Sequence, residues 1–334
     1  MTLPDLWFMI IGLFFVGYFV LDGFDFGIGM SIPFLSKDDT DRRVLINTIG
    51  PVWDLNETWV IVAGASLFAA FPEWYATIFS GFYLPMLFIL LGLILRGVSF
   101  EYRHQRPDHR WKRNFDRMIF VGSVVPTFMW GLIFANIVRG LPLTANFDYL
   151  GGVGYLFNPY GLLGGATLVM LFFTHGVIFA SLKTDGEIRI RARRLASVSG
   201  VITAIVAVVF LGITVALHGN PLSIVISLAA VLSLVIAYVA NLRGREGIAF
   251  AFMAATIALA VISLFASLFP NVLIATNDAA NTMTVANASS SHYTLQVMSW
   301  IALIFVPLIL AYQAFTYWIF RKRVTRAIVT VAGH

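Results

Sequence analysis

The segment Pro51-Val-Trp-Asp-Leu-Asn-Glu-Thr-Trp59 opens an apolar run that continues to Phe71. Two carboxylates, Asp54 and Glu57, therefore stand in the first turns of a segment close to the roughly 20 residues that a membrane helix needs. An ionisable side chain at the centre of such a helix costs about 2.5–3.5 kcal/mol on insertion scales, so its presence requires a reason. One interpretation is a helix start, with Pro51 near the first helical position and both carboxylates at the positive end of the helix dipole.

A second pair of acidic residues, Asp22 and Asp25, interrupts the preceding apolar segment. Each acidic pair has i,i+3 spacing, which places its two members on one face of a helix. Arg96 lies near the end of the third apolar segment, in Leu-Ile-Leu-Arg-Gly-Val. Because consecutive elements joined by short connections usually pack side by side, we expect the four carboxylates and the arginine to meet in a buried polar site.

The composition is that of an integral membrane protein. Of the 334 residues, 59% are hydrophobic and 12% are charged, and the mean hydropathy is +0.85; soluble domains carry about 25% charged residues. The chain contains no cysteine, which excludes disulfides, thiolate-ligated haem and cysteine-held iron–sulfur or zinc sites. The first basic residue is Lys37, so a basic signal-peptide region is lacking and we expect the first apolar segment to remain as a membrane helix.

The apolar segments predict an all-α polytopic membrane protein with nine transmembrane helices. The expected spans are 6–34, 52–71, 76–100, 118–139, 159–182, 196–217, 221–240, 248–269 and 294–319. We expect a single integral membrane domain over residues 1–334, with helix groups at about 6–139 and 159–319 joined by an outer loop near 140–158. Ser291 and Thr294 are candidate N-caps of the last span.

The basic residues alternate in register with the spans. Apart from Arg96 and Arg139, the 22 Lys and Arg residues all lie in the loops after spans one, three, five, seven and nine. The positive-inside rule places these loops in the cytoplasm, with the N-terminus outside and the C-terminus inside. The isoelectric point near 9.6 therefore reflects membrane topology, and no nucleic-acid partner is expected.

With this topology Asp22, Asp25, Asp54, Glu57 and Arg96 lie in the cytoplasmic half of the membrane. Intramembrane ionisable residues commonly form proton relays, and we interpret these five as a proton-conducting half-channel. The alternative is a structural cluster in which Arg96 pairs with one or two aspartates and locks the first three helices together. Four carboxylates around one arginine favour the half-channel, because a structural ion pair needs only one of them.

Histidine usage limits the cofactors. Of the six histidines only His175 lies well inside an expected span. Haem held between two histidines needs two such residues, so this chain alone cannot bind haem in that way. His175 with Met or Glu as the second ligand is one alternative, and a hydrogen-bonded interior histidine is the one we favour. We expect no catalytic, cofactor-binding or metal-binding residue in this chain alone.

A series of motifs runs through the chain from the first span to the last. The motifs are Asp22-Gly-Phe-Asp-Phe-Gly-Ile-Gly-Met30, Asp41-Arg-Arg, Asn47, Pro51–Trp59, Leu67-Phe-Ala-Ala-Phe-Pro, Phe79-Ser-Gly-Phe-Tyr83, Arg96, Phe100-Glu-Tyr-Arg103, Asn158-Pro-Tyr-Gly-Leu-Leu163, and Asn287-Ala-Ser-Ser-Ser-His-Tyr-Thr-Leu295 with Met298. In order and spacing, the chain resembles subunit II of the cytochrome bd-type quinol oxidases. Leu55, where many relatives have glycine, and the short turn at 218–221 depart from that pattern.

The resemblance implies a haem-free subunit whose partner, subunit I, carries two haems b, one haem d and the quinol site. The complex would oxidise quinol and reduce O2 to water in the aerobic respiratory chain of a bacterial cytoplasmic membrane. The resemblance also implies that Asp25 and Asp54 belong to a proton route with Arg96 near it, and that Trp59 lies near an apolar O2 path. A structural quinone and a small single-helix accessory subunit are further expectations.

A proton-coupled secondary transporter is the rival function. Such proteins show paired broken helices near the membrane midplane in two related halves. Here the ionisable groups crowd into the first three spans and the later spans hold almost none. An oxidase complex should be coloured by its haems, whereas a transporter embedded in the same membrane lipid should be colourless.

Overall fold

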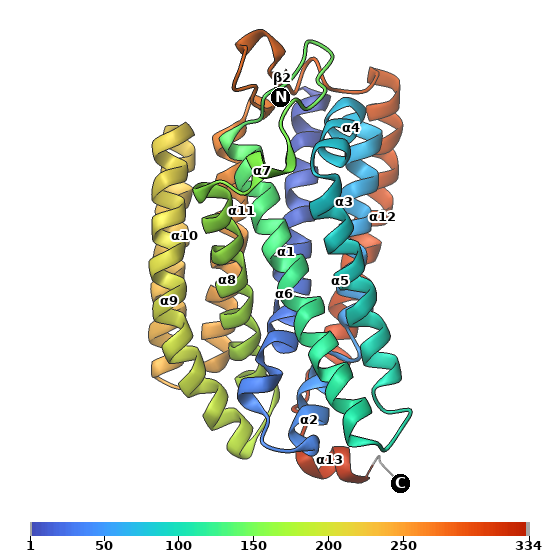
Figure 1. Cartoon of the computed structure of the whole chain (residues 1–334), viewed down its shortest axis with the longest axis vertical. Helices are drawn as coiled ribbons and strands as arrows, with labels where there is room; N and C mark the ends of the chain where they lie inside the picture. The colour runs from blue at the N-terminus through green and yellow to red at the C-terminus, as the bar shows by residue number, and fades with distance from the viewer. Residues whose placement is uncertain (1, 332–334) are drawn as a thin grey trace.

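The apolar segments form long helices that run roughly parallel to one another, with the two chain termini at opposite ends (Figure 1). The computed structural model describes residues 2–331. The helices are α1 (Leu3–Leu35), α2 (Asp39–Ile49), α3 (Trp53–Ala70), α4 (Pro72–Gly81), α5 (Tyr83–Tyr102), α6 (His109–Arg139), α7 (Val153–Leu156), α8 (Pro159–Lys183), α9 (Gly186–His218), α10 (Pro221–Leu242), α11 (Glu246–Leu268), α12 (His292–Ile319) and α13 (Arg326–Val331).

Eight of the described helices are long and apolar enough to cross a membrane, namely α1, α5, α6, α8, α9, α10, α11 and α12. The all-α membrane architecture is therefore confirmed, whereas the expected count of nine spans is not. The remaining expected span, at 52–71, corresponds to the 18-residue helix α3. Its first turns carry Asp54, Asn56 and Glu57, which lower its mean hydropathy, although it packs against α1 and α12 like its apolar neighbours.

The prediction of one continuous helix over 76–100 was wrong, because the chain bends at Phe82 between α4 and α5. Proline explains the break. Pro85 has no N–H, so the carbonyl of Gly81 cannot receive the i→i−4 hydrogen bond that would continue α4 into α5. The sequence analysis also did not anticipate the short helix α2, which follows the first span.

Helix α1 lies at the centre of the bundle and packs against α3, α6, α8 and α11. Its second half is almost wholly buried, including Asp22 and Asp25. The backbones of α1 and α8 meet at Gly27 and Gly176, where a side chain at Gly27 would overlap the carbonyl oxygen of Phe172. This close approach brings α8 directly against the half of α1 that carries the two aspartates.

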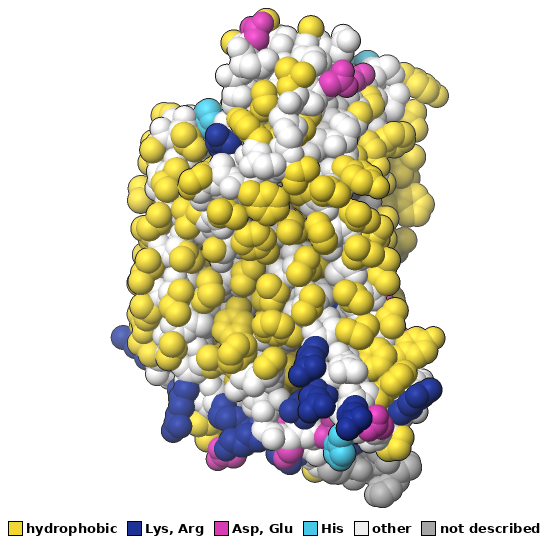
Figure 2. All heavy atoms as spheres, viewed as in Figure 1, with side chains coloured by type: hydrophobic (Ala, Val, Ile, Leu, Met, Phe, Trp, Pro, Cys, Tyr) yellow, Lys and Arg dark blue, Asp and Glu magenta, His cyan; other side chains and the backbone are white. Residues whose placement is uncertain are grey.

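Basic side chains gather at one end of the molecule, below a broad apolar belt (Figure 2). We call this end, which carries α2 and α13, the basic end. The opposite end, the loop end, holds the N-terminus and a small antiparallel pairing of β1 (Asn271–Leu273) with β2 (Met283–Thr284). There Ser291 accepts a hydrogen bond from the backbone N–H of Thr294 at 3.2 Å, which confirms Ser291 as the N-cap of α12.

Helix α12 is the least buried of the long helices: only 6% of its most apolar window is covered. Its buried residues are Leu295, Gln313 and Thr316. Near the loop end, the indole Nε1 of Trp7 on α1 donates to the carbonyl of Leu295 at 3.2 Å. Near the basic end, Gln313 forms the equivalent contact with α3, which is described below. One long apolar face of α12 is therefore left without a partner among residues 2–331.

The segment after α12 folds back beneath the bundle. The backbone N–H of Val324 donates to the carbonyl of Lys183 at 2.7 Å. Arg326 then pairs with Asp41 at 2.7 Å and with Asp38 at 2.6 Å, both on the α2 side. The backbone N–H of Asp41 and the guanidinium of Arg326 both donate to Asp38 and lower the pKa of its carboxyl below the usual range. The start of α13 is thus attached by ion pairs to Asp38 and Asp41 at the start of α2.

Candidate functional site

Arg96 of α5 is the centre of the buried polar site and has no solvent-exposed surface. Its Nη2 lies 2.8 Å from Oδ1 and 3.0 Å from Oδ2 of Asp22 on α1, and 3.0 Å from Oε2 of Glu57 on α3. Its guanidinium carbon stands 3.9 Å from the centroid of the Phe26 ring, a cation–π contact. One arginine therefore joins α1, α3 and α5.

The charges of this cluster do not balance. Arg96 is a single positive charge, and it bonds two carboxylates, of which Asp22 is fully buried and Glu57 is 24% exposed. Two of its donor groups, Nε and Nη1, are buried without a hydrogen-bond partner among residues 2–331. Buried charges are normally fully paired and hydrogen-bonded. A site that departs from this rule is a candidate for exchanging protons or water.

Asp25 lies one turn further along α1 and does not pair with Arg96. Its Oδ2 accepts a hydrogen bond from Nδ2 of Asn56 on α3 at 2.7 Å. Its Oδ1 is buried and accepts no hydrogen bond from the described part of the chain. In the structural alternative Asp25 would form an ion pair with Arg96. The structure instead gives Asp25 a neutral amide as its partner.

The carboxamide of Asn56 is held in turn by α12. Its Oδ1 accepts hydrogen bonds from Nε2 of Gln313 and from the hydroxyl of Tyr317, both at 2.8 Å. Gln313 also accepts from the indole Nε1 of Trp59 at 3.3 Å. Sequence reasoning missed Asn56, Gln313 and Tyr317. The available signal was an amide and a phenol with i,i+4 spacing inside the otherwise apolar last span.

Asp54 occupies a different position from the other three carboxylates. It is exposed, and its side chain makes no hydrogen bond or ion pair within residues 2–331. It lines a surface groove between α3 and α5 together with Glu57 and apolar side chains, which include Trp53, Ile61, Phe68, Leu90, Leu93 and Ile94. Glu57 thus faces both the groove and Arg96, and it connects the exposed Asp54 with the buried Asp22.

Trp59 packs at the junction of α1, α3 and α12. Its ring lies against Gly17, where any side chain would overlap the indole, and its centroid is 6.1 Å from that of Phe14. It lines a second, entirely different groove, which is apolar and opens between α3 and α12 beside Val306 and Tyr312. Trp59, which the family resemblance implies to lie near an O2 path, therefore borders a hydrophobic surface opening.

His175 is a hydrogen-bonded interior residue, the interpretation favoured from the sequence. Its Nε2 is 3.1 Å from the carbonyl oxygen of Val20, and its ring stacks on Phe250 at 4.7 Å with an interplanar angle of 8°. Within residues 2–331, no three His, Cys, Asp or Glu side chains are grouped so as to hold a metal ion.

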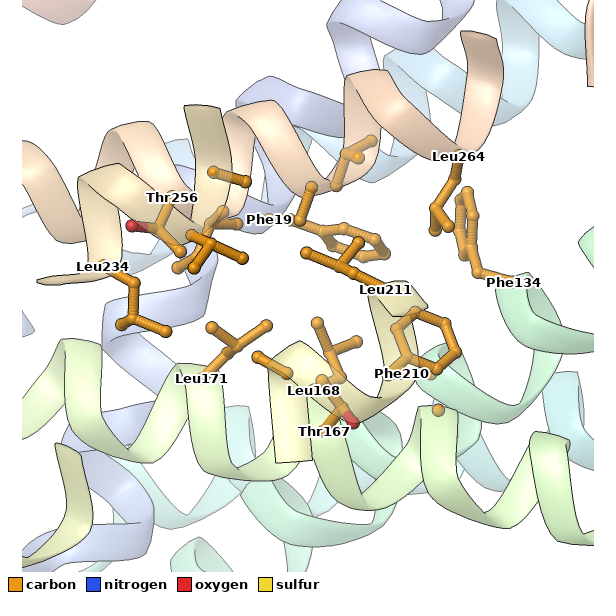
Figure 3. Close-up of a pocket in the computed structure, with 18 residues that line it drawn as sticks. Phe19, Phe134, Thr167, Leu168, Leu171, Phe210, Leu211, Leu234, Thr256 and Leu264 are labelled. Atoms are coloured by element: carbon orange, nitrogen blue, oxygen red, sulfur yellow. The ribbon is translucent and has the colours of Figure 1, made fainter. Parts of the chain in front are cut away.

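An apolar cavity of about 50 Å³ lies elsewhere in the bundle, among α1, α6, α8, α9, α10 and α11. The side chains that point into it in Figure 3 are Phe19, Phe134, Leu168, Leu171, Phe210, Leu211, Leu234 and Leu264. Its two hydroxyls, of Thr167 and Thr256, already donate to backbone carbonyls of Val206 and Phe252. No donor remains to orient a polar ligand, so the cavity suits a small apolar molecule or part of a hydrocarbon chain.

Comparison with known proteins gives consistent matches. The profile of a family described as Cytochrome bd terminal oxidase subunit II matches residues 3–320. Cytochrome bd ubiquinol oxidase subunit 2 of Bacillus subtilis is 40% identical over 329 residues, which cover 97% of each chain. Cytochrome bd-I ubiquinol oxidase subunit 2 of Escherichia coli K12 is 34% identical over 366 residues, which cover 97% of this chain and 96% of that one.

A solved structure shares the fold. A chain from the structure of bd oxidase from Geobacillus thermodenitrificans aligns with a TM-score of 0.74 at 16% sequence identity. The alignment covers 96% of this chain and 99% of that chain. The arrangement of the helices is therefore one that has been observed in a bd oxidase.

Proposed function

The chain belongs to the cytochrome bd terminal oxidase subunit II family, and from this premise we propose that it is a haem-free subunit that delivers protons to a haem-bearing subunit I. As a member of this family it is a multi-pass membrane subunit of a respiratory oxidoreductase complex. In the proposal, subunit I carries two haems b and one haem d, oxidises quinol, and reduces O2 to water. A proton-coupled transporter is set aside, because the family match spans residues 3–320.

The observation that carries the proposal is the surplus of carboxylates over cations in the buried site. Arg96 bonds Asp22 and Glu57, which leaves Asp25 and Asp54 without a cation. A cluster that served only to join helices would need one carboxylate, and each additional buried acid would destabilise the fold. Acids kept in a membrane at such a cost commonly carry protons.

The proposed route follows the exposure of the acids. Asp54, at the surface of the α3–α5 groove, accepts protons from the aqueous phase at the basic end. Glu57 borders the same groove and bonds Arg96, so it connects the groove with the buried Asp22. Asp25 is as buried as Asp22 and lies one turn closer to the basic end, next to Asn56. We infer that water and the unpartnered donors of Arg96 link these acids, because proton transfer needs a continuous chain of hydrogen bonds.

The proposed orientation places the basic end in the cytoplasm of a bacterial cell, with the N-terminus on the outer side of the cytoplasmic membrane. The support is the concentration of Lys and Arg side chains at one end (Figure 2) and the positive-inside rule. Protons would then enter from the cytoplasm, so their consumption in O2 reduction would contribute to the proton-motive force.

The proposed surface for subunit I comprises the exposed face of α12 and the α3–α5 groove. The groove opens on the side of the bundle and is lined mainly by apolar side chains around Asp54 and Glu57, and a charged side chain facing hydrocarbon is strongly disfavoured. A protein partner removes this difficulty, since it can supply polar contacts to the carboxylate. The apolar face of α12 is continuous with the groove that Trp59 lines, where we propose that O2 passes toward subunit I.

Two of the expected partners remain predictions. Among the described residues we assign no surface to the small single-helix accessory subunit. A structural quinone would need donors for its carbonyl groups, and the cavity of Figure 3 offers none beyond hydroxyls already bonded to the backbone. That cavity could therefore accommodate a segment of an isoprenoid tail, but not the quinone ring.

The proposal is tested by Asp54→Asn in the complete complex. The amide keeps the size of the side chain but cannot ionise, so we expect haem content and subunit ratio to stay normal while quinol-driven O2 uptake falls. Glu73→Gln, which removes an exposed carboxylate from α4 outside the groove, is the matched control and should have no effect. Normal O2 uptake at normal haem content would remove Asp54 from the route, and a colourless preparation would overturn the assignment as an oxidase subunit.

A further inference from the structure

We propose that Gln313 and Tyr317 of α12 are positioning residues for Asp25: they fix the carboxamide of Asn56 so that it donates to Asp25, and they thereby couple the placement of α12 to the proton route. The inference rests on the proposed function, because it assigns a role to residues around an acid of that route. The inference extends the proposed function, because it names α12 as the helix that orients the hydrogen bond to Asp25 and identifies the atoms involved.

The orientation of the Asn56 amide is determined by its surroundings. Asparagine oxygen and nitrogen atoms are exchanged easily, and their assignment follows from the hydrogen-bond network. Here two donors, Nε2 of Gln313 and the hydroxyl of Tyr317, converge on Oδ1 at 2.8 Å. The Nδ2 group is thereby directed at Oδ2 of Asp25, 2.7 Å away. A rotated amide would set N–H against both donors and oxygen against the carboxylate, so α12 selects one orientation.

Helix α12 has few other attachments in this half of the molecule. Its one buried residue besides Gln313 near the basic end is Thr316, whose hydroxyl donates to the carbonyl of Tyr312 within the same helix. Both hydrogen bonds that α12 donates to α3 at this level end on the same oxygen atom of Asn56, and the one bond that α3 donates in return, from Trp59, ends on Gln313 as well. A shift of the lower part of α12 therefore breaks both bonds together, and the amide is then free to rotate away from Asp25.

The exposed face of α12 links the hydrogen bonds on Asn56 to binding of the partner subunit. Because only 6% of the most apolar window of α12 is covered within residues 2–331, its position depends on the subunit that docks against it in the proposed complex. Docking of the partner fixes the position of α12, and α12 fixes the orientation of the Asn56 carboxamide. Asn56 in turn donates the one hydrogen bond that the Asp25 carboxylate accepts within residues 2–331. A partner docked on α12 would thus hold Asp25 in the hydrogen-bonded geometry described here.

The charged groups that act on Asp25 come from several helices. Asp22 lies on the same helix, Glu57 on α3 and Arg96 on α5. Tyr317 faces it from α12, and His175 of α8 packs on the other side of α1, where it bonds Val20. Of these neighbours only Tyr317 belongs to α12. Changes at α12 should therefore alter the proton affinity of Asp25 without disturbing the contacts of Arg96 with Asp22 and Glu57.

The test removes the two donors separately and together in the intact complex. Tyr317→Phe deletes only the hydroxyl, and Gln313→Met keeps the length of the side chain without its amide. Each single variant leaves one donor on Asn56 Oδ1, so we expect O2 uptake to fall by about twofold or less. The double variant leaves none, and we expect a fall of about tenfold, the effect of losing one hydrogen bond to a charged group. Thr316→Val, a buried isosteric change on the same helix, is the matched control.

Three measurements distinguish positioning from a structural role. Haem per chain and the subunit ratio should stay normal in every variant. The pH dependence of O2 uptake should be displaced in the double variant and in Tyr317→Phe, and unchanged in Thr316→Val. In an Asp25→Asn background, the double variant should cause no further loss, because the group that Asn56 serves is already gone.

The outcomes separate this proposal from the proposed function. Full O2 uptake in the double variant with an unchanged pH profile overturns the positioning role, and so does a further loss of similar size in the Asp25→Asn background. If the double variant loses haem or the partner subunit, the pH profile of Tyr317→Phe decides, and an undisplaced profile means that the network only joins helices. Normal uptake in both Asp54→Asn and Asp25→Asn instead refutes the proton route itself, whatever Gln313 and Tyr317 do.

Discussion

Replacement of Arg96 by leucine would leave Asp22 and Glu57 without their cation inside the helix bundle. Removing one partner of a buried ion pair costs about 3–5 kcal/mol, because the remaining charge is neither paired nor hydrated. The lost contact with the Phe26 ring, 3.9 Å from the guanidinium carbon, adds about 2 kcal/mol in a desolvated site. Together these terms amount to roughly half of the 5–15 kcal/mol that stabilises an ordinary domain. We therefore expect Arg96→Leu to accumulate poorly and to recover little haem-bearing partner.

The assay compares thermal unfolding and haem per chain among four variants of the complex. Arg96→Lys keeps a charge near Asp22 but not the paired hydrogen bonds of a guanidinium, so its loss should be intermediate. Adding Asp22→Asn to Arg96→Leu should restore part of the stability, because it removes the unpaired charge. Arg117→Leu, an exposed substitution at the basic end, should change neither quantity. Normal unfolding and haem content in Arg96→Leu would refute the view that Arg96 compensates buried acids.

Three further outcomes are expected. Asp25→Asn should slow O2 uptake by at least tenfold at unchanged haem content, and Asp25→Glu should retain part of the activity; full uptake in Asp25→Asn would exclude this residue from the route. Gly27→Ala should lower the unfolding temperature by forcing α1 from α8, at a cost of about 1–3 kcal/mol, whereas Gly64→Ala, where nothing lies within 4 Å of the added carbon, should not. The pKa of Asp38 is depressed in the folded chain, so the attachment of α13 should hold above the ordinary aspartate pKa, near 3.9, and be lost as the pH falls below it. A nitroxide at Ile328→Cys, in a chain without other cysteines, should become mobile over that interval, and at neutral pH when Arg326→Gln is added, since that change removes the pairs with both Asp38 and Asp41; constant mobility would contradict the ion-pair attachment.

The global arrangement was predictable because its causes are local. Apolar runs of sufficient length predict the spans, and basic loops after every second span predict which end of the bundle is charged. The bend at Phe82 was missed because the apolar run continues through it, although Pro85 carries the information. Helix α3 was predicted as a membrane span from the apolar run that ends at Phe71, but its polar first turns lower its mean hydropathy, and its crossing of the membrane stays a prediction.

The candidate site was predicted as a set of residues but not as a set of pairs. The i,i+3 spacing of Asp22 with Asp25 suggested a shared role, yet one bonds Arg96 and the other bonds Asn56. Which face of α12 turns inward is decided by packing between helices distant in the chain, and no local pattern reports it. Gln313 and Tyr317 could therefore be noticed as polar residues in an apolar span, but their partner could not be named.

The distance in sequence between the partners of the polar site has a consequence for biogenesis. Arg96 follows Asp22 by 74 residues, so at about 5–20 residues per second the ribosome delivers the arginine roughly 4–15 s after the aspartate. Gln313 follows Asn56 by 257 residues, a delay of roughly 13–50 s at the same rates. During this interval α1 has to enter the membrane with its aspartates protonated or sheltered by the insertion machinery. The hydrogen bonds of the polar site are complete only after α12 has been synthesised. Any pause in translation before α12 therefore prolongs the time for which Asp25 and Asn56 lack their final surroundings.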